Sequence, residues 1–268
     1  MKISRIRHPF LYNLNVSRHR LFWRVKEFLS FKKFAQEKTV LDLFFKIFTH
    51  KSVLIRKLGD SNIRLQRQKI KNLSLATPKI HKILIKPGET FSYWNLISEP
   101  SARRGYVEGM LLSQGEVIVG VGGGLCQLAN LLYWMAIHTP LTIAERHRHS
   151  FDAFPDSGRT LPFASGATVF YNYVDLQFRN DTEATFEIKV WLDDEFLHGE
   201  ILVDRQLQIR YHVVERDHRF FIDEKTGKKM RENKLFRQIV DVRTGKMIGE
   251  ELICENKAEV KYPIKILN

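Results

Sequence analysis

A run of three glycines followed at once by an apolar helix pattern constrains this chain more than any other feature. Gly122, Gly123 and Gly124 stand before residues 125–138, which contain no further Gly or Pro until Pro140. Consecutive glycines permit positive φ angles and let the backbone approach a neighbouring group closely. The sequence therefore predicts a tight loop that leads into a central helix, which Pro140 stops.

The first turn of this predicted helix carries a cysteine. A helix N-terminus presents unpaired N–H groups and about half a unit of positive charge, which should lower the pKa of Cys126 below the usual value of about 8.5. Gln127 could offer its amide to a developing oxyanion, together with N–H groups of the glycine loop. We predict Cys126 as a nucleophile and Gly122, Gly123, Gly124 and Gln127 as ligand-binding residues. The alternative is that Cys126 is a small buried residue.

A cluster of polar residues follows the helix and supplies candidate bases. In an extended segment alternate side chains share a face, so Glu145, His147 and His149 should point one way and Arg146 the other. We predict His149 or His147 as the general base of Cys126, and Glu145 or Asp152 as the carboxylate that orients it. Arg146 is predicted to contact the ligand.

The positive charge of the chain is confined to its N-terminal part. Residues 1–86 contain 21 Lys and Arg against 4 Asp and Glu, whereas the rest contains 22 against 26. Two apolar runs, Leu21–Leu29 and Val40–Phe48, lie among these cations and favour helices. They indicate either core-packing helices with solvated basic faces or a helix that lies on anionic lipid. We expect a basic, largely helical N-terminal region over residues 1–79 and a separate domain over 80–268.

Several classes of function are disfavoured by what the sequence lacks. Cys126 and Cys254 are its only cysteines, too few for a disulfide framework or a zinc site, and we expect neither a metal nor a cofactor. The glycine tract lacks the lysine of a phosphate-binding loop and the acidic residue of a dinucleotide fingerprint. Nucleic-acid binding is disfavoured because no known nucleic-acid-binding module accompanies the cations. Without a secretory pattern or an apolar span of about 20 residues, we expect a cytoplasmic protein.

The C-terminal half has the pattern of an antiparallel sheet. Residues 82–86 and the segments after residue 142 show short apolar or alternating runs, including ATVFYNY, LQFRN and ATFEIKVWL. Two Thr-Gly-Lys turns, at residues 226–228 and 244–246, separate the last three runs as hairpins. The expected fold class is α+β, with a basic helical N-terminal region, a central helix after the glycine loop and a mostly antiparallel C-terminal sheet.

Five segments together give the chain a family resemblance. In order along the sequence they are GETFSYWN, GGGLCQLANLLYWMAIHTPL, ERHRHSFDAFPD, SGATVFYNYVDLQFRN and MRENKLFRQIVDV. This combination resembles the VanW family over nearly everything from about residue 80 onward. Its Gly-Gly-Gly-x-Cys-Gln signature falls on residues 122–127, and its Glu-Arg-His…His-Ser signature on residues 145–150. The resemblance implies a link to glycopeptide resistance and cell-wall precursors.

Two functions remain open at this point. The first is a cysteine-dependent acyltransferase or hydrolase that acts on a peptide or amide of a cell-wall precursor, with Cys126 attacking and His149 as base. The second is a non-enzymatic accessory protein in which the same loop and histidines bind an anionic precursor or peptide. In that case the basic N-terminal region would hold it peripherally at the inner face of an anionic membrane.

Overall fold

The computed structural model describes residues 14, 17–23, 25, 29–55, 63–113, 116–148, 151–152, 155 and 160–263. Its helices are α2 (Ile63–Ile80), α3 (Tyr93–Ile97) and α4 (Cys126–Ala136), with a 3-10 turn, η1, over Ala102–Arg104. The strands are β1 (Lys33–Phe34), β2 (Phe45–Val53), β3 (Ile83–Ile85), β4 (Glu89–Ser92), β5 (Glu108–Ser113), β6 (Glu116–Val121), β7 (Thr142–Glu145), β8 (Phe151–Asp152), β9 (Gln177–Arg179), β10 (Phe186–Leu192), β11 (Phe196–Val203), β12 (Ile209–Ile222), β13 (Lys229–Asp241) and β14 (Met247–Val260). The α+β prediction is confirmed.

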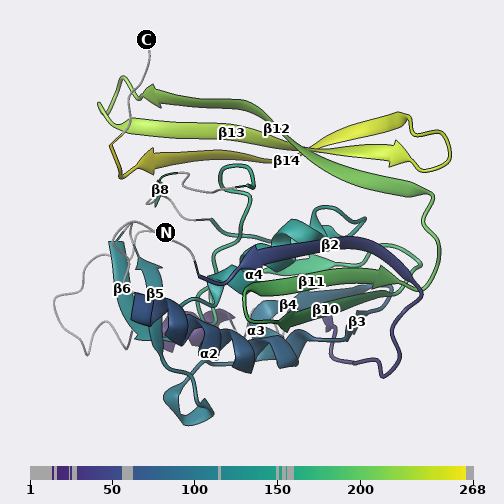
Figure 1. Ribbon diagram of the computed structural model, residues 1–268, viewed down its shortest axis with the longest axis horizontal. Coiled ribbons are helices and arrows are strands. Elements are labelled where there is room, and N and C mark those ends of the chain that lie inside the picture. The colour runs from purple at the N-terminus through teal and green to yellow at the C-terminus, as the bar shows by residue number, and fades with distance from the viewer. Residues whose placement is uncertain are drawn as a thin grey trace.

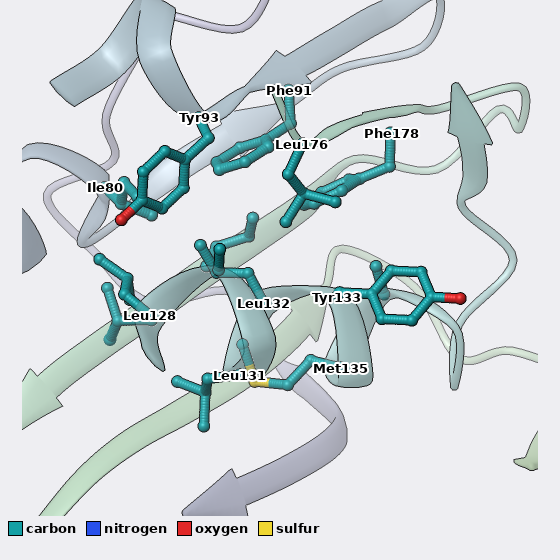
Figure 2. Close-up of a cluster of buried hydrophobic side chains, with 14 of the residues drawn as sticks. Ile80, Phe91, Tyr93, Leu128, Leu131, Leu132, Tyr133, Met135, Leu176 and Phe178 are labelled. Atoms are coloured by element: carbon teal, nitrogen blue, oxygen red, sulfur yellow. The ribbon is translucent and has the colours of Figure 1, made fainter. Parts of the chain in front are cut away.

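The central helix α4 is the hub of the core. Its apolar residues pack between two sheets, one ordered β2-β11-β10-β3 and the other β1-β4-β9-β7. Figure 2 shows Leu128, Leu132 and Tyr133 of the helix among buried aromatic rings that include Phe91 and Phe178. These two rings stack with their centroids 4.4 Å apart. Because α4 is apolar nearly all round, it is buried from Leu128 to Ala136 except at Asn130, which is exposed.

The second apolar run of the N-terminal region forms no helix, which corrects the prediction: residues 40–44 are irregular and mostly exposed, and Phe45 begins the strand β2. β2 pairs antiparallel with β11 along its whole length, and its outer residues alternate between exposed and half-buried. Phe45, Ile47, Phe48 and Val53 are aromatic or β-branched, so they favour a strand wherever a free sheet edge is available. Further along this region, the helix α2 packs its buried face on β10 and β5.

A three-stranded antiparallel sheet, β12 to β14, lies along one side of the body (Figure 1). Its two hairpins turn at the predicted Thr-Gly-Lys segments, where Gly227 and Gly245 have φ of +66° and +67°. The short strand β8 adds to its edge in parallel with β14. The predicted strand over residues 167–173 is wrong: the chain turns back, so that Phe170 pairs with Val174 in an isolated bridge.

The described part of the N-terminal region begins with a helical segment over residues 17–23. Leu21 and Phe22 are 65% and 63% exposed, and Val25 and Leu29 are also exposed. Arg20, on the same segment, instead forms an ion pair with Glu99 at 2.9 Å. No helix in the described ranges is both long and apolar enough to cross a membrane.

Candidate functional site

The glycine loop joins β6 to α4 and is packed tightly against both backbone and side chains of its neighbours. Gly122 and Gly124 have φ of +79° and +91°, in the left-handed region that other residues rarely adopt. Gly123 lies so close to Gly109 of β5 that an added Cβ would stand 2.1 Å from the Gly109 carbonyl carbon. The three glycines therefore meet two different requirements: a left-handed turn, and a close approach of the loop backbone to the backbone of β5.

Two polar residues of α2 hold this loop in place. The Asn72 side chain donates to the carbonyl oxygens of Val107 and Gly123, both at 2.9 Å, and accepts from the Val107 N–H. The buried Lys69 donates to the Leu54 carbonyl at 2.5 Å, and its stem would meet any Cβ on Gly124. The sequence prediction missed both residues. Their signal is that they continue the apolar face of α2 at helical spacing.

Cys126 is the first residue of α4, as predicted, and its thiol borders a cavity of about 120 Å³. The side chain is half-buried, and Sγ lies 3.7 Å from the Val169 carbonyl oxygen, to which it donates. Six residues that share the wall of this cavity are Arg20, Trp94, Glu99, Gly122, Val169 and Tyr171. The thiol thus faces a small, mostly apolar hollow at the start of a helix.

Burial raises the pKa of Cys126, which corrects the expectation that the helix start lowers it. Desolvation disfavours the thiolate more than the backbone N–H of Cys126 favours it. A positive helix end lowers a thiol pKa most where water or a second cation also stabilises the anion. Here the sulfur packs against the apolar core instead. The resting group is therefore a protonated thiol.

The predicted carboxylate and histidine pair exists after β7. His147 Nε2 lies 2.9 Å from Glu145 Oε1, and both side chains are on one face of the segment while Arg146 is on the other, as the alternation predicted. The Glu145 carboxylate also accepts from the Asp175 N–H at 3.1 Å. His147 pairs with Thr168, the neighbour of Val169, but is not among the residues that line the Cys126 cavity. His149 lies outside the described residues.

Arg146 and Gln127 are both engaged by the protein itself. Arg146 donates to the carbonyl oxygens of Ala164 and Gly166, and to Asn256 Oδ1 at 3.3 Å. Its guanidinium also lies 4.9 Å from the centroid of the Tyr133 ring. The Gln127 amide donates to Ser52 Oγ and the Val53 carbonyl, both at 2.9 Å. Neither side chain lines the cavity, and their ligand-binding roles stay predictions.

A buried carboxylate behind the cavity wall was not predicted. Asp175 is 2% exposed and accepts from Ser92 Oγ, from the Trp94 and Leu176 N–H groups and from the Gln177 amide. Burial raises its pKa to about 6 against the effect of these hydrogen bonds. Asp175 fixes the start of α3 and hence Trp94, which lines the cavity. The only sequence signal was one acid within the apolar run YVDLQF.

The structure thus brings together two separate pairs, Gly122 with Cys126 and Glu145 with His147. The cavity wall at Val169 and the strand bridge at Thr168 connect the two. Within the described residues, no group of three or more His, Cys, Asp and Glu side chains is placed to hold a metal ion.

Comparison with known proteins shows which family the chain resembles. A family model described as VanW like protein matches residues 68–202. The vancomycin B-type resistance protein VanW of Enterococcus faecalis is 36% identical over 199 residues, which are 74% of this chain and 72% of that protein. The uncharacterized protein YoaR of Bacillus subtilis is 30% identical over 112 residues, 41% of this chain and 34% of that protein. No solved structure matches. The chain belongs to the VanW family.

Proposed function

We propose that this protein uses Cys126 as a nucleophile in acyl transfer or amide hydrolysis on a peptide of a cell-wall precursor. The observation that carries the proposal is the position of the thiol, which borders a cavity at the start of α4 where helix N–H groups converge. The substrate class follows from the similarity to a protein named for vancomycin resistance.

The reaction has two steps. A base takes the proton from Cys126 Sγ, the sulfur adds to the substrate carbonyl carbon, and the C–N bond breaks as the base returns the proton to the leaving amine. The thioester that remains is resolved by an incoming amine, which completes a transfer, or by water, which completes a hydrolysis. Because both Gln127 amide hydrogens are engaged, and the Gln127, Leu128 and Ala129 N–H groups bond to the Gly124 and Leu125 carbonyls, we assign the oxyanion to the backbone N–H of Cys126.

The raised pKa of Cys126 makes a base necessary, because little thiolate exists at neutral pH without one. His147 is a candidate, since Glu145 orients its ring and its backbone pairs with the segment that forms the cavity wall. His149, two residues on, is the other candidate. Two single variants, His147→Gln and His149→Gln, would identify which imidazole accepts the proton. Only loss of the base should change the acid limb of the pH dependence of activity.

The test uses purified protein and a mixture of muropeptides prepared from bacterial cell wall. The wild type should show an added acyl mass on the intact protein and a change in the muropeptide profile. Cys126→Ala should lose both, whereas Cys254→Ala, the matched control, should keep both. Turnover by Cys126→Ala equal to that of the wild type would overturn the proposal.

A second function is favoured by the exposed apolar side chains of the N-terminal segment, among them Leu21 and Phe22. These side chains stand on a basic segment and suit the interface of an anionic membrane. In this alternative the protein is a non-enzymatic accessory at the inner membrane face that holds an anionic precursor. Cys126→Ala would then bind precursor as the wild type does, and no acyl mass would appear on either protein.

A further inference from the structure

The helical segment over residues 17–23 forms part of the wall of the Cys126 cavity. Arg20, on this segment, lines the cavity beside Glu99 and Tyr171. Its Nη1 donates to Glu99 Oε1 at 2.9 Å, and its guanidinium lies 5.2 Å from the centroid of the Tyr171 ring. One side of the cavity is therefore supplied by a part of the chain that is distant in sequence from the rest of the wall.

This side of the wall is held less firmly than the others. The Arg20 and Glu99 side chains are 35% and 46% exposed, and an exposed ion pair contributes little to stability. The neighbouring His19 ring makes a tilted contact with the Tyr173 ring, with 6.0 Å between the centroids. None of the side chains described for residues 17–23 packs into the hydrophobic core. The segment can therefore move away from the body without disturbing the core.

The cavity is too small for the proposed substrate. Its volume is about 120 Å³, whereas pockets for small organic ligands usually span about 300 Å³ or more. Trp94, Leu125 and Val169 in its wall are buried in the core, so they cannot make room without loss of packing. The requirement for a wider cavity rests on the proposed function. Movement of the segment that carries Arg20 would meet it.

We propose that residues 17–23 are a lid on the Cys126 cavity, held in place by the Arg20–Glu99 ion pair and opened by an anionic membrane surface. Leu21 and Phe22, next to Arg20, are 65% and 63% exposed, and apolar side chains among cations bind the interface of an anionic bilayer. Lipid phosphates then compete with Glu99 for the Arg20 guanidinium, and the negative surface repels the Glu99 carboxylate. Membrane binding and access to the thiol are thereby coupled.

The experiment measures access to the thiol and not turnover, so the lid and the proposed function can fail separately. The Cys254→Ser protein is labelled with iodoacetamide, which is small, and with a neutral polyethylene glycol maleimide, which is bulky. The rate with the bulky reagent divided by the rate with the small one reports opening, because a change in the pKa of Cys126 affects both rates. We expect this ratio to rise about threefold to tenfold on vesicles of phosphatidylglycerol and phosphatidylcholine, but not on phosphatidylcholine alone.

Variants separate the ion pair from the membrane contact. Glu99→Gln keeps the shape of the wall but removes the ion pair, so its ratio should already be high without vesicles. Glu108→Gln is the matched control, because Glu108 is an exposed acid outside the cavity wall, and it should behave like the wild type. The double variant Leu21→Gln, Phe22→Gln should lose the response to vesicles. It should keep a rise with salt, which screens an exposed ion pair.

Three results would overturn the proposal. A ratio in Glu99→Gln equal to that of the wild type would mean that the ion pair does not control entry. A ratio that stays level or falls on anionic vesicles would mean that the membrane does not open the cavity. A wild-type response to vesicles in the Leu21→Gln, Phe22→Gln variant would mean that the exposed side chains of the segment do not make the membrane contact.

Discussion

The two ends of α4 are built in opposite ways. At its N-terminal end Cys126 faces a cavity, and an added Cβ on the glycine loop has no room. At its C-terminal end the carbonyls are covered: His138 Nδ1 lies 2.7 Å from the Trp134 oxygen of the last turn, and Arg237 donates at 2.6 Å to the carbonyl of Thr139, in the turn that follows the helix. A helix end with its polar groups satisfied stabilises the fold, whereas one that borders a hollow leaves room for a ligand.

The largest expected effect is at the N-terminal end. Gly123→Ala would place a Cβ against the Gly109 backbone, which cannot yield without moving β5, so we expect a loss of about 3 kcal/mol or more in the free energy of unfolding. Gly227→Ala is the control. It has a positive φ but nothing within 4 Å of the added atom, and should cost about 1 kcal/mol. Urea unfolding of both variants measures the difference, and similar costs would mean that the close approach is not required.

The next effect concerns the C-terminal end. Arg237→Ala removes the cation that covers the Thr139 carbonyl and should cost about 2 kcal/mol. Arg237 pairs with Glu251 and lies over the Tyr211 ring. Arg219→Ala is the matched control, since Arg219 pairs with Glu232 and lies over the Phe221 ring but is largely exposed. Its cost should stay below about 1 kcal/mol. Both variants should keep the wild-type alkylation rate of Cys126. A large change in that rate for Arg237→Ala would mean that the two ends are not independent.

The two ends should also respond to pH with opposite signs. Burial lowers the pKa of His138 to about 4, so the unfolded chain is protonated first and stability falls as pH drops from about 6.5 to 4. The pKa of Asp175, beside the N-terminal cavity, is raised to about 6, so its contribution is present below about 3.8 and is lost as pH rises through 6.

Chemical unfolding at intervals between pH 4 and 7 separates these two contributions. His138→Gln should reduce the loss of stability in acid, and Asp175→Asn should increase it, relative to the wild type. The net slope of the wild type is smaller than either contribution because the two offset one another. The same slope in all three proteins would contradict the assignment of these shifts.

The smallest effect concerns the basic N-terminal region, which meets the N-terminal end of α4 through Arg20 and Glu99. Each cation near an anionic leaflet contributes about 1 kcal/mol, so we expect sedimentation with anionic liposomes at low salt and release at high salt. Removal of residues 1–31 should abolish it, because the exposed Leu21, Phe22 and Leu29 are lost with the charge. Sedimentation that ignores salt would indicate apolar insertion, and none at any salt would exclude the membrane.

The sequence predicted the elements whose pattern is local. The glycine loop, the start of α4 at Cys126, the two hairpins and the opposite faces of Arg146 and His147 follow from spacing and turn residues alone. It failed for β2, because an apolar run of aromatic and β-branched residues becomes a strand only when the edge of β11 is available to it. Whether that edge is available depends on the tertiary structure, which a local sequence pattern does not contain.

For the candidate site, residue types were predictable but their environment was not. Position alone implied an ionised Cys126, whereas packing against the core makes desolvation the larger effect. We missed Lys69, Asn72 and Asp175 because each bonds to a segment that is distant in the sequence and comes close only in the folded protein. Arg146 lies on the face opposite His147, as predicted, but its partners and those of Gln127 could not be foreseen.

The most direct test of the central claim, that Cys126 is a protonated thiol that borders an open cavity, is its alkylation rate as a function of pH. The Cys254→Ser protein leaves Cys126 as the single thiol, and iodoacetamide is a small alkylating reagent suited to a cavity of about 120 Å³. We predict complete labelling with a midpoint above the ordinary pKa of a thiol, because burial disfavours the thiolate. A midpoint at or below that value, or no labelling of the folded protein at any pH, would contradict the account.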